Sequence, residues 1–178
     1  MTKGTNEPYR IMTSRSEYRL LLRQDNADQR LTRRGYDIGL VSEERLRAVE
    51  EKYAAVDREI RRLTHTGASP SPALSAFLAE RGTADVTDGC PLAALLRRPQ
   101  LHYDDLAPFD PTRPDLPADV REQVEIRVKY EGYIQRQQKQ VEEFRRMESH
   151  RLPPGLDYAS IQGLRLEARE KLAAVQPL

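Results

Sequence analysis

The residues from Asp119 to Met147 read DVREQVEIRVKYEGYIQRQQKQVEEFRRM and predict one long helix. Asp119 is placed to cap its N-terminus, and Glu122, three residues later, can reach back in a capping box. Alternation of apolar and charged residues from Val124 to Tyr130 also suits a strand, but the segment runs without a turn into strong helix formers, which favours the helix. The expected buried face recurs in steps of three, four and seven, at Ile126, Tyr130, Tyr133, Ile134, Val141, Phe144 and Met147.

A second long helix is predicted from Glu43 to Leu63, where Ser42 can cap the N-terminus. Because the two long helices are of comparable length, we expect them to pack antiparallel as the spine of an all-α, irregular multi-helical domain. The second helix has a heptad seam formed by Leu46, Val49, Tyr53, Val56, Ile60 and Leu63.

Shorter helices are expected on either side of the second one. A helix at Asp28–Arg34 is closed by Gly35, another begins after Ser71 and ends at Gly82, and a third covers Pro91–Arg97. Prolines at 108, 111, 114 and 117 exclude a regular helix from residue 99 to residue 117. We expect this acidic segment, called the strap below, to cross the outside of the spine.

The chain is predicted to have three parts. Residues 1–13 have no periodic pattern and form an extended lead-in, and residues 14–151 form the helical domain. Two prolines and a glycine at positions 153–155 end that domain. Residues 152–178 are expected to begin a C-terminal helical subdomain, with a turn capped by Asp157 and a last helix near Leu166 to Val175.

Composition excludes several classes of protein. No run approaches the roughly 20 apolar residues of a membrane span, and the mean hydropathy is -0.74. The single cysteine, Cys90, excludes an internal disulfide and fits a cytoplasmic protein. Between Thr66 and Asp119 there are 4 Lys/Arg against 8 Asp/Glu, whereas basic residues are in excess on both sides. A nucleic acid is therefore expected to contact the flanks and not the middle.

Catalytic patterns are missing from the sequence. The three histidines have no Cys or His at zinc-ligand spacing, and there is no glycine-rich phosphate loop and no GxGxxG fingerprint. Cys90 is interpreted as structural. We therefore expect no catalytic residue and no metal site, and this chain alone is not expected to be an enzyme.

Basic residues near the N-terminus are the first candidates for RNA contacts. A helix beginning at Ser14 would place Arg15, Arg19 and Arg23 on one face. Such a row of like charges suits phosphate, but it also suits salt bridges to Glu17, Asp25 and Asp28. The same basic surface is extended by Arg30, Arg33 and Arg34.

The first long helix carries the second set of candidates. Basic and aromatic residues interleave at Lys129, Tyr130, Tyr133, Arg136 and Lys139, which suits phosphates with a base stacked on a ring. Both tyrosines can also be interpreted as core residues with hydrated hydroxyl groups, and this interpretation is favoured for Tyr133 and left open for Tyr130.

Three stretches resemble one family. VKYEGYIQRQQ with the downstream LPPGLDY, the N-terminal TKGTNEPYRIMTSRSEYRLLLRQDNADQRLT, and LLRRP at Leu95–Pro99 are similar to the C-terminal helical region of the MnmG (GidA) family. The resemblance implies a parent enzyme that uses FAD and NADH to modify C5 of the wobble uridine of tRNA, together with an MnmE-like GTPase. The family's FAD- and NADH-binding portion and its last helices have no counterpart in this sequence.

The resemblance implies that this region holds tRNA, that the parent is a homodimer, and that the GTPase binds mainly through the C-terminal helices beyond residue 178. The cofactors would belong to the parent and not to this part. The resemblance favours a contact of at least one of Arg15, Arg19 and Arg23 with a phosphate or with the edge of the cofactor, and it leaves open which of the two. A helical adaptor for another protein, in which the arginines form only salt bridges, remains the alternative.

Overall fold

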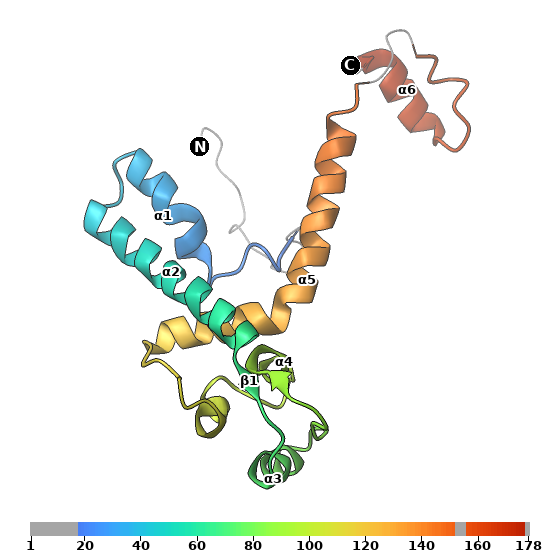
Figure 1. Cartoon of the computed structure of the whole chain (residues 1–178). Helices are drawn as coiled ribbons and strands as arrows, with labels where there is room; N and C mark the ends of the chain where they lie inside the picture. Colours follow the sequence, from blue (N-terminus) through green and yellow to red (C-terminus); the bar gives the residue numbers. More distant parts are fainter. Residues whose placement is uncertain (1–17, 152–155, 177–178) are drawn as a thin grey trace, which may run out of the picture. The chain divides into compact units, whose positions relative to one another are not determined.

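The computed structural model describes residues 18–151 and 156–176. The all-α class is confirmed in this part of the chain, where the sheet has only two short strands. The chain divides into two compact units between Gln137 and Gln138. The elements in order are α1 (Ala27–Asp37), α2 (Glu43–His65), β1 (Gly67–Ala68), α3 (Pro72–Glu80), β2 (Cys90–Pro91), α4 (Leu92–Leu96), the 3-10 helix η2 (Asp104–Phe109), α5 (Ala118–Glu148) and α6 (Leu166–Val175) (Figure 1).

Helix α2 forms as predicted. Ser42 caps it, its Oγ accepting from the backbone N–H of Arg45 at 3.3 Å. The heptad seam is confirmed, since five of its residues are buried and Ile60 is half-buried. Glu59 is also buried, at 3% exposure, which the seam did not predict.

Helix α1 packs along α2 and is longer than predicted. It continues through Gly35, which was expected to end it. A Cβ atom at Gly35 would lie 2.7 Å from Val41 Cγ2, so the glycine permits the close approach of the returning chain. The helix ends at Asp37, just before Gly39 with φ +77°.

Helix α5 is confirmed, but its predicted cap and buried face are wrong. The helix begins at Ala118, so Asp119 lies inside the first turn. Tyr130 and Tyr133 are 46% and 58% exposed, and Phe144 and Met147 are also exposed. Burial is confined to the first turns of α5, where Val120, Val124 and Val128 join the core of the first unit. The buried residues are Val120, Gln123, Val124 and Val128.

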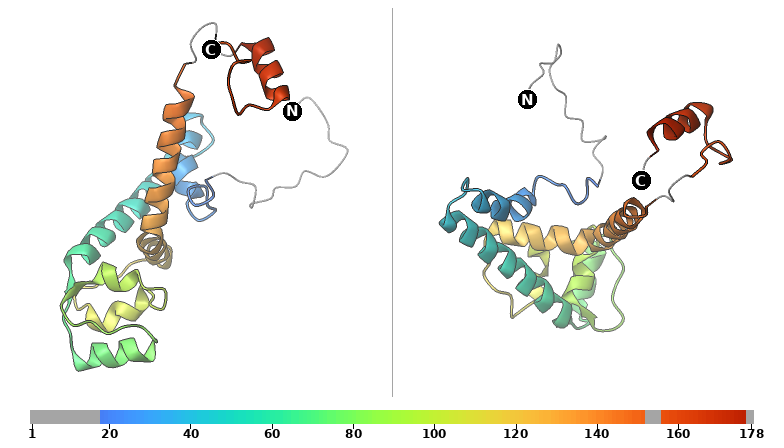
Figure 2. Two further views of the ribbon diagram at one scale, coloured as in Figure 1. Left: turned by 90° about the vertical axis from the view of Figure 1, so that its right-hand side faces the viewer. Right: turned by 90° about the horizontal axis from the view of Figure 1, so that it is seen from above.

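The two long helices do not run antiparallel where they meet. Lys52 pairs with Asp119 at 3.3 Å, and Asp57 pairs with Arg127 at 2.7 Å, so residues advance in the same order along both helices. Figure 2 shows the first half of α5 beside α2 in this sense. Antiparallel packing is expected of helices joined by a short loop. Here α3, α4 and η2 lie between the two long helices in the sequence. The chain can therefore return toward the middle of α2, where Asp119 pairs with Lys52, before α5 begins.

The segment between the long helices supplies much of the core. The predicted helices α3 and α4 are confirmed, and Ser71 caps α3 by accepting from the N–H of Leu74 at 3.2 Å. Strands β1 and β2 pair antiparallel, with Ala68 opposite Cys90. The fully buried leucines of α3 and α4 are Leu74, Leu78, Leu92, Leu95 and Leu96.

The strap is not external, contrary to the prediction. Leu101, Tyr103 and Leu106 are at most 3% exposed and belong to the core. Prolines exclude an α-helix, as expected, but η2 forms with Pro108 inside it. The apolar residues between the prolines provide the free energy that draws the strap inward.

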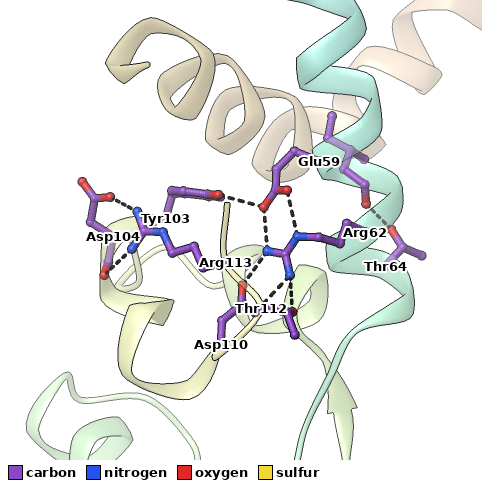
Figure 3. A network of polar contacts seen from close by, with 9 residues as sticks. Glu59, Arg62, Thr64, Tyr103, Asp104, Asp110, Thr112 and Arg113 are labelled. Atoms are coloured by element: carbon purple, nitrogen blue, oxygen red, sulfur yellow. Dashed lines mark hydrogen bonds and ion pairs between the residues drawn. The ribbon is translucent and has the colours of Figure 1, made fainter. Parts of the chain in front are cut away.

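A polar network fixes the strap to α2 (Figure 3). The Arg62 guanidinium donates to both oxygens of Glu59, at 2.8 and 2.9 Å, and to Asp110 Oδ1 at 3.0 Å. The Tyr103 hydroxyl donates to Glu59 at 2.7 Å. Burial and the neighbouring Glu59 carboxylate raise the pKa of Tyr103 to about 12. Arg113 pairs with Asp104 and lies 4.5 Å over the Tyr103 ring.

The helix predicted from Ser14 does not continue to Arg23. Residues 14–17 lie outside the described part of the chain, and from Tyr18 onward the backbone forms a turn. The N–H groups of Leu21 and Leu22 both donate to the Tyr18 carbonyl, and Tyr18 has φ +53°.

The second unit contains the end of α5, a turn and α6. Asp157 accepts from the N–H of Ala159 at 3.0 Å, which confirms the predicted capped turn. Helix α6 is confirmed within its predicted bounds, and none of its residues is buried.

Candidate nucleic-acid interface

A hollow of about 600 Å³ lies on the surface of the first unit, between the turn after Tyr18, the end of α4 and helix α5. We call it the tyrosine hollow. It joins two predicted site residues, Lys129 and Tyr130, to residues that are distant in sequence. Its lining residues are Leu20, Arg97, Pro99, Lys129, Tyr130 and Tyr133.

Two exposed rings dominate the tyrosine hollow. Tyr130 and Tyr133 are about half exposed, so the interpretation of both as core residues is wrong. Their ring centroids are 6.3 Å apart and their planes are inclined by 52°, a tilted pair. Both side chains are therefore partly accessible from the solvent.

Two cations border the rings, and each has an acidic neighbour. Lys129 Nζ lies 2.9 Å from Glu125 Oε1, and Arg97 Nη2 lies 2.6 Å from Glu131 Oε2. Burial alone would raise the pKa of Glu125, but hydrogen bonds from the Tyr103 N–H, Lys129 and His102 outweigh it and lower this pKa. Glu125 is thus a stable carboxylate, whereas the Arg97–Glu131 pair is half exposed on both sides.

The basic row continues along α5. With 3.6 residues per turn, Lys129, Tyr133 and Arg136 lie on one face of the helix. Arg136 is exposed and has no ion pair with any described residue. Lys139, also exposed and without such a pair, lies further along the helix in the second unit.

Arg19 and Arg23 do not lie in one helical row. Arg15 lies outside the described residues, and the turn after Tyr18 separates Arg19 from Arg23. Arg23 donates to both oxygens of Asp25, at 2.9 and 3.0 Å, as the salt-bridge alternative predicted. Burial would raise the pKa of Asp25, but hydrogen bonds from Arg23 and Gln123 lower it.

The remaining arginines of this region differ in availability. Arg30 donates to Asn26 Oδ1 at 2.9 Å and to the Arg23 carbonyl at 3.2 Å, so it braces the start of α1. Arg33 pairs with Glu50 of α2 but keeps 57% of its side chain exposed. Arg19 and Arg34 are exposed and form no ion pair with a described residue.

Sequence reasoning missed Arg97, Leu20 and Pro99 as part of this site. Two signals were available, because Arg97 and Pro99 belong to the LLRRP stretch and Leu20 to the N-terminal stretch. Their proximity to α5 depends on the fold. No cluster of potential metal ligands occurs among the described residues. In the same part of the chain, no helix is long and apolar enough to cross a membrane.

Comparison with known proteins identifies related chains. The family model described as the tRNA modifying enzyme MnmG/GidA C-terminal helical domain matches residues 43–138, and that of the MnmG/GidA C-terminal helical bundle matches residues 140–178. The tRNA uridine 5-carboxymethylaminomethyl modification enzyme MnmG of Caldicellulosiruptor saccharolyticus is 51% identical over 99% of this chain, and that of Geobacillus thermodenitrificans is 49% identical over 100%.

Solved structures agree with these matches. The structure of Aquifex aeolicus GidA in the form II crystal has a TM-score of 0.67 at 35% identity over 98% of this chain, and the form I crystal has 0.62 at 34%. The chain spans 28% of the length of both curated relatives and 27% and 26% of these two GidA chains.

Proposed function

The chain belongs to the MnmG/GidA family of tRNA-modifying enzymes, as its C-terminal helical part, and we propose that it holds tRNA for the modification reaction. One observation carries the proposal. The tyrosine hollow is lined by residues of the N-terminal stretch, of LLRRP and of VKYEGYIQRQQ, which are far apart in sequence and all resemble the family. Its lining combines two exposed rings with two cations, a combination that suits RNA.

Eight of the candidate residues are given a role in this proposal. Lys129 and Arg136 contact phosphates from one face of α5, and Arg19 and Arg34 contact phosphates near the N-terminal turn and α1. Arg23 and Arg30 act indirectly, because their hydrogen bonds hold the turn that places Leu20 in the hollow. Base recognition falls to Tyr130 and Tyr133.

The parent enzyme would supply the chemistry. By family, we propose that it uses FAD and NADH, works with an MnmE-like GTPase in the cytoplasm as a homodimer, and modifies C5 of the wobble uridine. The sequence of this chain has no glycine-rich phosphate loop, so its residues do not fit a flavin or nicotinamide nucleotide. We assign them no step of the redox reaction.

Titration of fluorescent tRNA with the 178-residue chain over a series of salt concentrations tests the proposal. Binding should weaken steeply with salt, and Lys129→Ala with Arg136→Ala should reduce the slope of log K against log salt by roughly 0.7 to 0.9 per residue. Arg58→Ala, an exposed arginine on α2, is the matched control. Absence of salt-dependent tRNA binding by the folded chain would refute the proposed function.

One observation favours the adaptor as a second candidate. Leu31 in α1, and Ile38 and Leu40 in the loop after it, are 52%, 71% and 80% exposed. Exposed apolar side chains in one region suit contact with another protein. Polar substitution of Ile38 and Leu40 should then weaken pull-down of an MnmE-like GTPase or of the parent's remaining portion, and leave tRNA binding unchanged.

A further inference from the structure

We infer that the tyrosine hollow binds a single unstacked nucleotide of RNA, with the base against Tyr133 and the phosphate between Lys129 and Arg97. The inference rests on the proposed function and makes it specific. It distinguishes a site for one extruded nucleotide from a surface that only follows the backbone of a folded RNA.

The position of the rings supports a base-stacking site. Tyr133 is the more exposed of the two, at 58%, and lies on the same helix face as Lys129. Since the two ring planes are inclined by 52°, one flat base can stack on only one of them. Tyr133 therefore provides the platform and Tyr130 the tilted side wall.

The size and lining of the hollow also fit one nucleotide. Its volume of about 600 Å³ falls within the roughly 300–1,000 Å³ of small-ligand sites. Leu20 and Pro99 give it apolar walls, and the side chains of Lys129 and Arg97, each paired with a carboxylate, border it. A base in the interior of a duplex keeps both faces stacked on its neighbours and cannot present one to Tyr133, so the site favours unpaired RNA.

Glu131 competes with the RNA phosphate for the guanidinium of Arg97. It holds Arg97 at 2.6 Å, but both side chains are about half exposed, and exposed ion pairs contribute little to stability. An incoming phosphate can therefore replace the Glu131 carboxylate at the guanidinium, with bidentate geometry. The arginine is kept oriented toward the hollow until RNA binds.

Two RNA probes with the 178-residue chain test the inference: a tRNA anticodon stem-loop, which has unpaired bases, and a blunt-ended RNA duplex of the same length. Tyr133→Ala should weaken stem-loop binding by about 5- to 150-fold, the range for one base on one ring, and Tyr133→Trp should preserve it. Duplex binding should be the same in all three proteins. Circular dichroism confirms that the variants fold.

Charge variants probe the phosphate site. Arg97→Ala should reduce the salt slope for the stem-loop by about 0.7. Glu131→Gln should tighten stem-loop binding by up to about 5-fold, the equivalent of an exposed ion pair, whereas Glu44→Gln on α2 should not.

These experiments distinguish failure of the nucleotide site from failure of the proposed function. A folded Tyr133→Ala variant that binds the stem-loop as tightly as the unsubstituted 178-residue chain would refute the nucleotide site, and so would one that loses stem-loop and duplex binding equally. RNA binding itself would still stand. If neither RNA binds the unmodified chain, the proposed function itself fails.

Discussion

The Tyr103 hydroxyl group lies 2.7 Å from Glu59 Oε1, and both residues are 3% exposed. This hydrogen bond joins the strap to α2 in the interior of the first unit. Glu59 is in turn neutralised by Arg62, which also binds Asp110. A buried carboxylate is stable only while such partners are complete.

Removal of the Tyr103 hydroxyl should therefore destabilise the fold. Tyr103→Phe leaves Glu59 one donor short, and the free energy of unfolding should fall by about 1.5–3 kcal/mol, the range for a hydrogen bond to a charged group. Urea denaturation measures the change. Tyr36→Phe, at an exposed position of α1, is the control, and an equal effect of the two substitutions would contradict the role of the network.

The network should also determine stability in acid. Burial would raise the pKa of Asp110, but hydrogen bonds from Arg62 and Thr112 lower it below the usual 3.8. A lowered folded-state pKa stabilises the protein above the unfolded value, and this contribution is lost as the pH falls through the folded value. Asp110→Asn should lower stability at pH 7 and flatten its loss below about pH 4. If the stability of Asp110→Asn depended on acid pH in the same way as that of the unsubstituted chain, the Asp110 carboxylate would not contribute to the loss of stability in acid.

Substitution by alanine should change the stability of the protein differently at two helical glycines. At Gly132 in α5, no atom lies within 4 Å of the position of a new Cβ, so Gly132→Ala should stabilise the protein by about 0.5–1 kcal/mol. At Gly35 the new Cβ would meet Val41 Cγ2 at 2.7 Å, which should cancel the gain or reverse it. Thermal melts of Gly35→Ala alone and together with Val41→Ala distinguish the steric clash from the effect of helix propensity, because Val41→Ala removes the Cγ2 atom that the new Cβ would meet.

The N-terminal arginines should separate into two kinds. Arg19→Ala and Arg34→Ala should each lower the salt slope of tRNA binding by about 0.7 to 0.9 with little loss of stability. Arg23→Ala should mainly destabilise the turn, because it breaks the two hydrogen bonds to Asp25. Parallel urea and tRNA titrations give the comparison, and a full slope loss for Arg23→Ala without destabilisation would reverse the assignment.

Hydrogen exchange should differ sharply between α2 and α6. Helix α2 has six buried residues, whereas α6 has 10 residues and none is buried. Helices this short are marginal without packing, so amides of α6 should exchange much faster. If α6 were as protected as α2 in the 178-residue chain, a binding surface for it would have to exist in solution.

Local signals predicted the helices well. The cap at Ser42 and the seam of α2 lie within one helix, and both are confirmed. The buried face of α5 was mispredicted because the sequence supplies several apolar stripes, and the neighbours decide which is covered. Burial of Leu101 and Tyr103 likewise depends on the partners that α2 and α5 offer to the strap.

The candidate site was predicted only in the part that one helix supplies. Lys129 and Tyr130 follow from the interleaved pattern of α5, and both line the tyrosine hollow. Arg97 and Leu20 reach it through tertiary folding, and no spacing rule connects them to α5. The prediction that Arg19 and Arg23 lie in one row was wrong for the opposite reason, since it assumed a continuous helix where the chain turns after Tyr18.

The assembly of the tyrosine hollow from three distant stretches links binding to folding. An unfolded or half-folded chain does not bring Leu20, Arg97 and Tyr133 together, so an occupant of the hollow binds the native state alone. At a free concentration 100 times its dissociation constant, such a ligand adds about 2.7 kcal/mol to the free energy of unfolding. The RNA would then stabilise the fold that forms its own binding site. A rise in melting temperature when RNA is added would measure occupancy without any label.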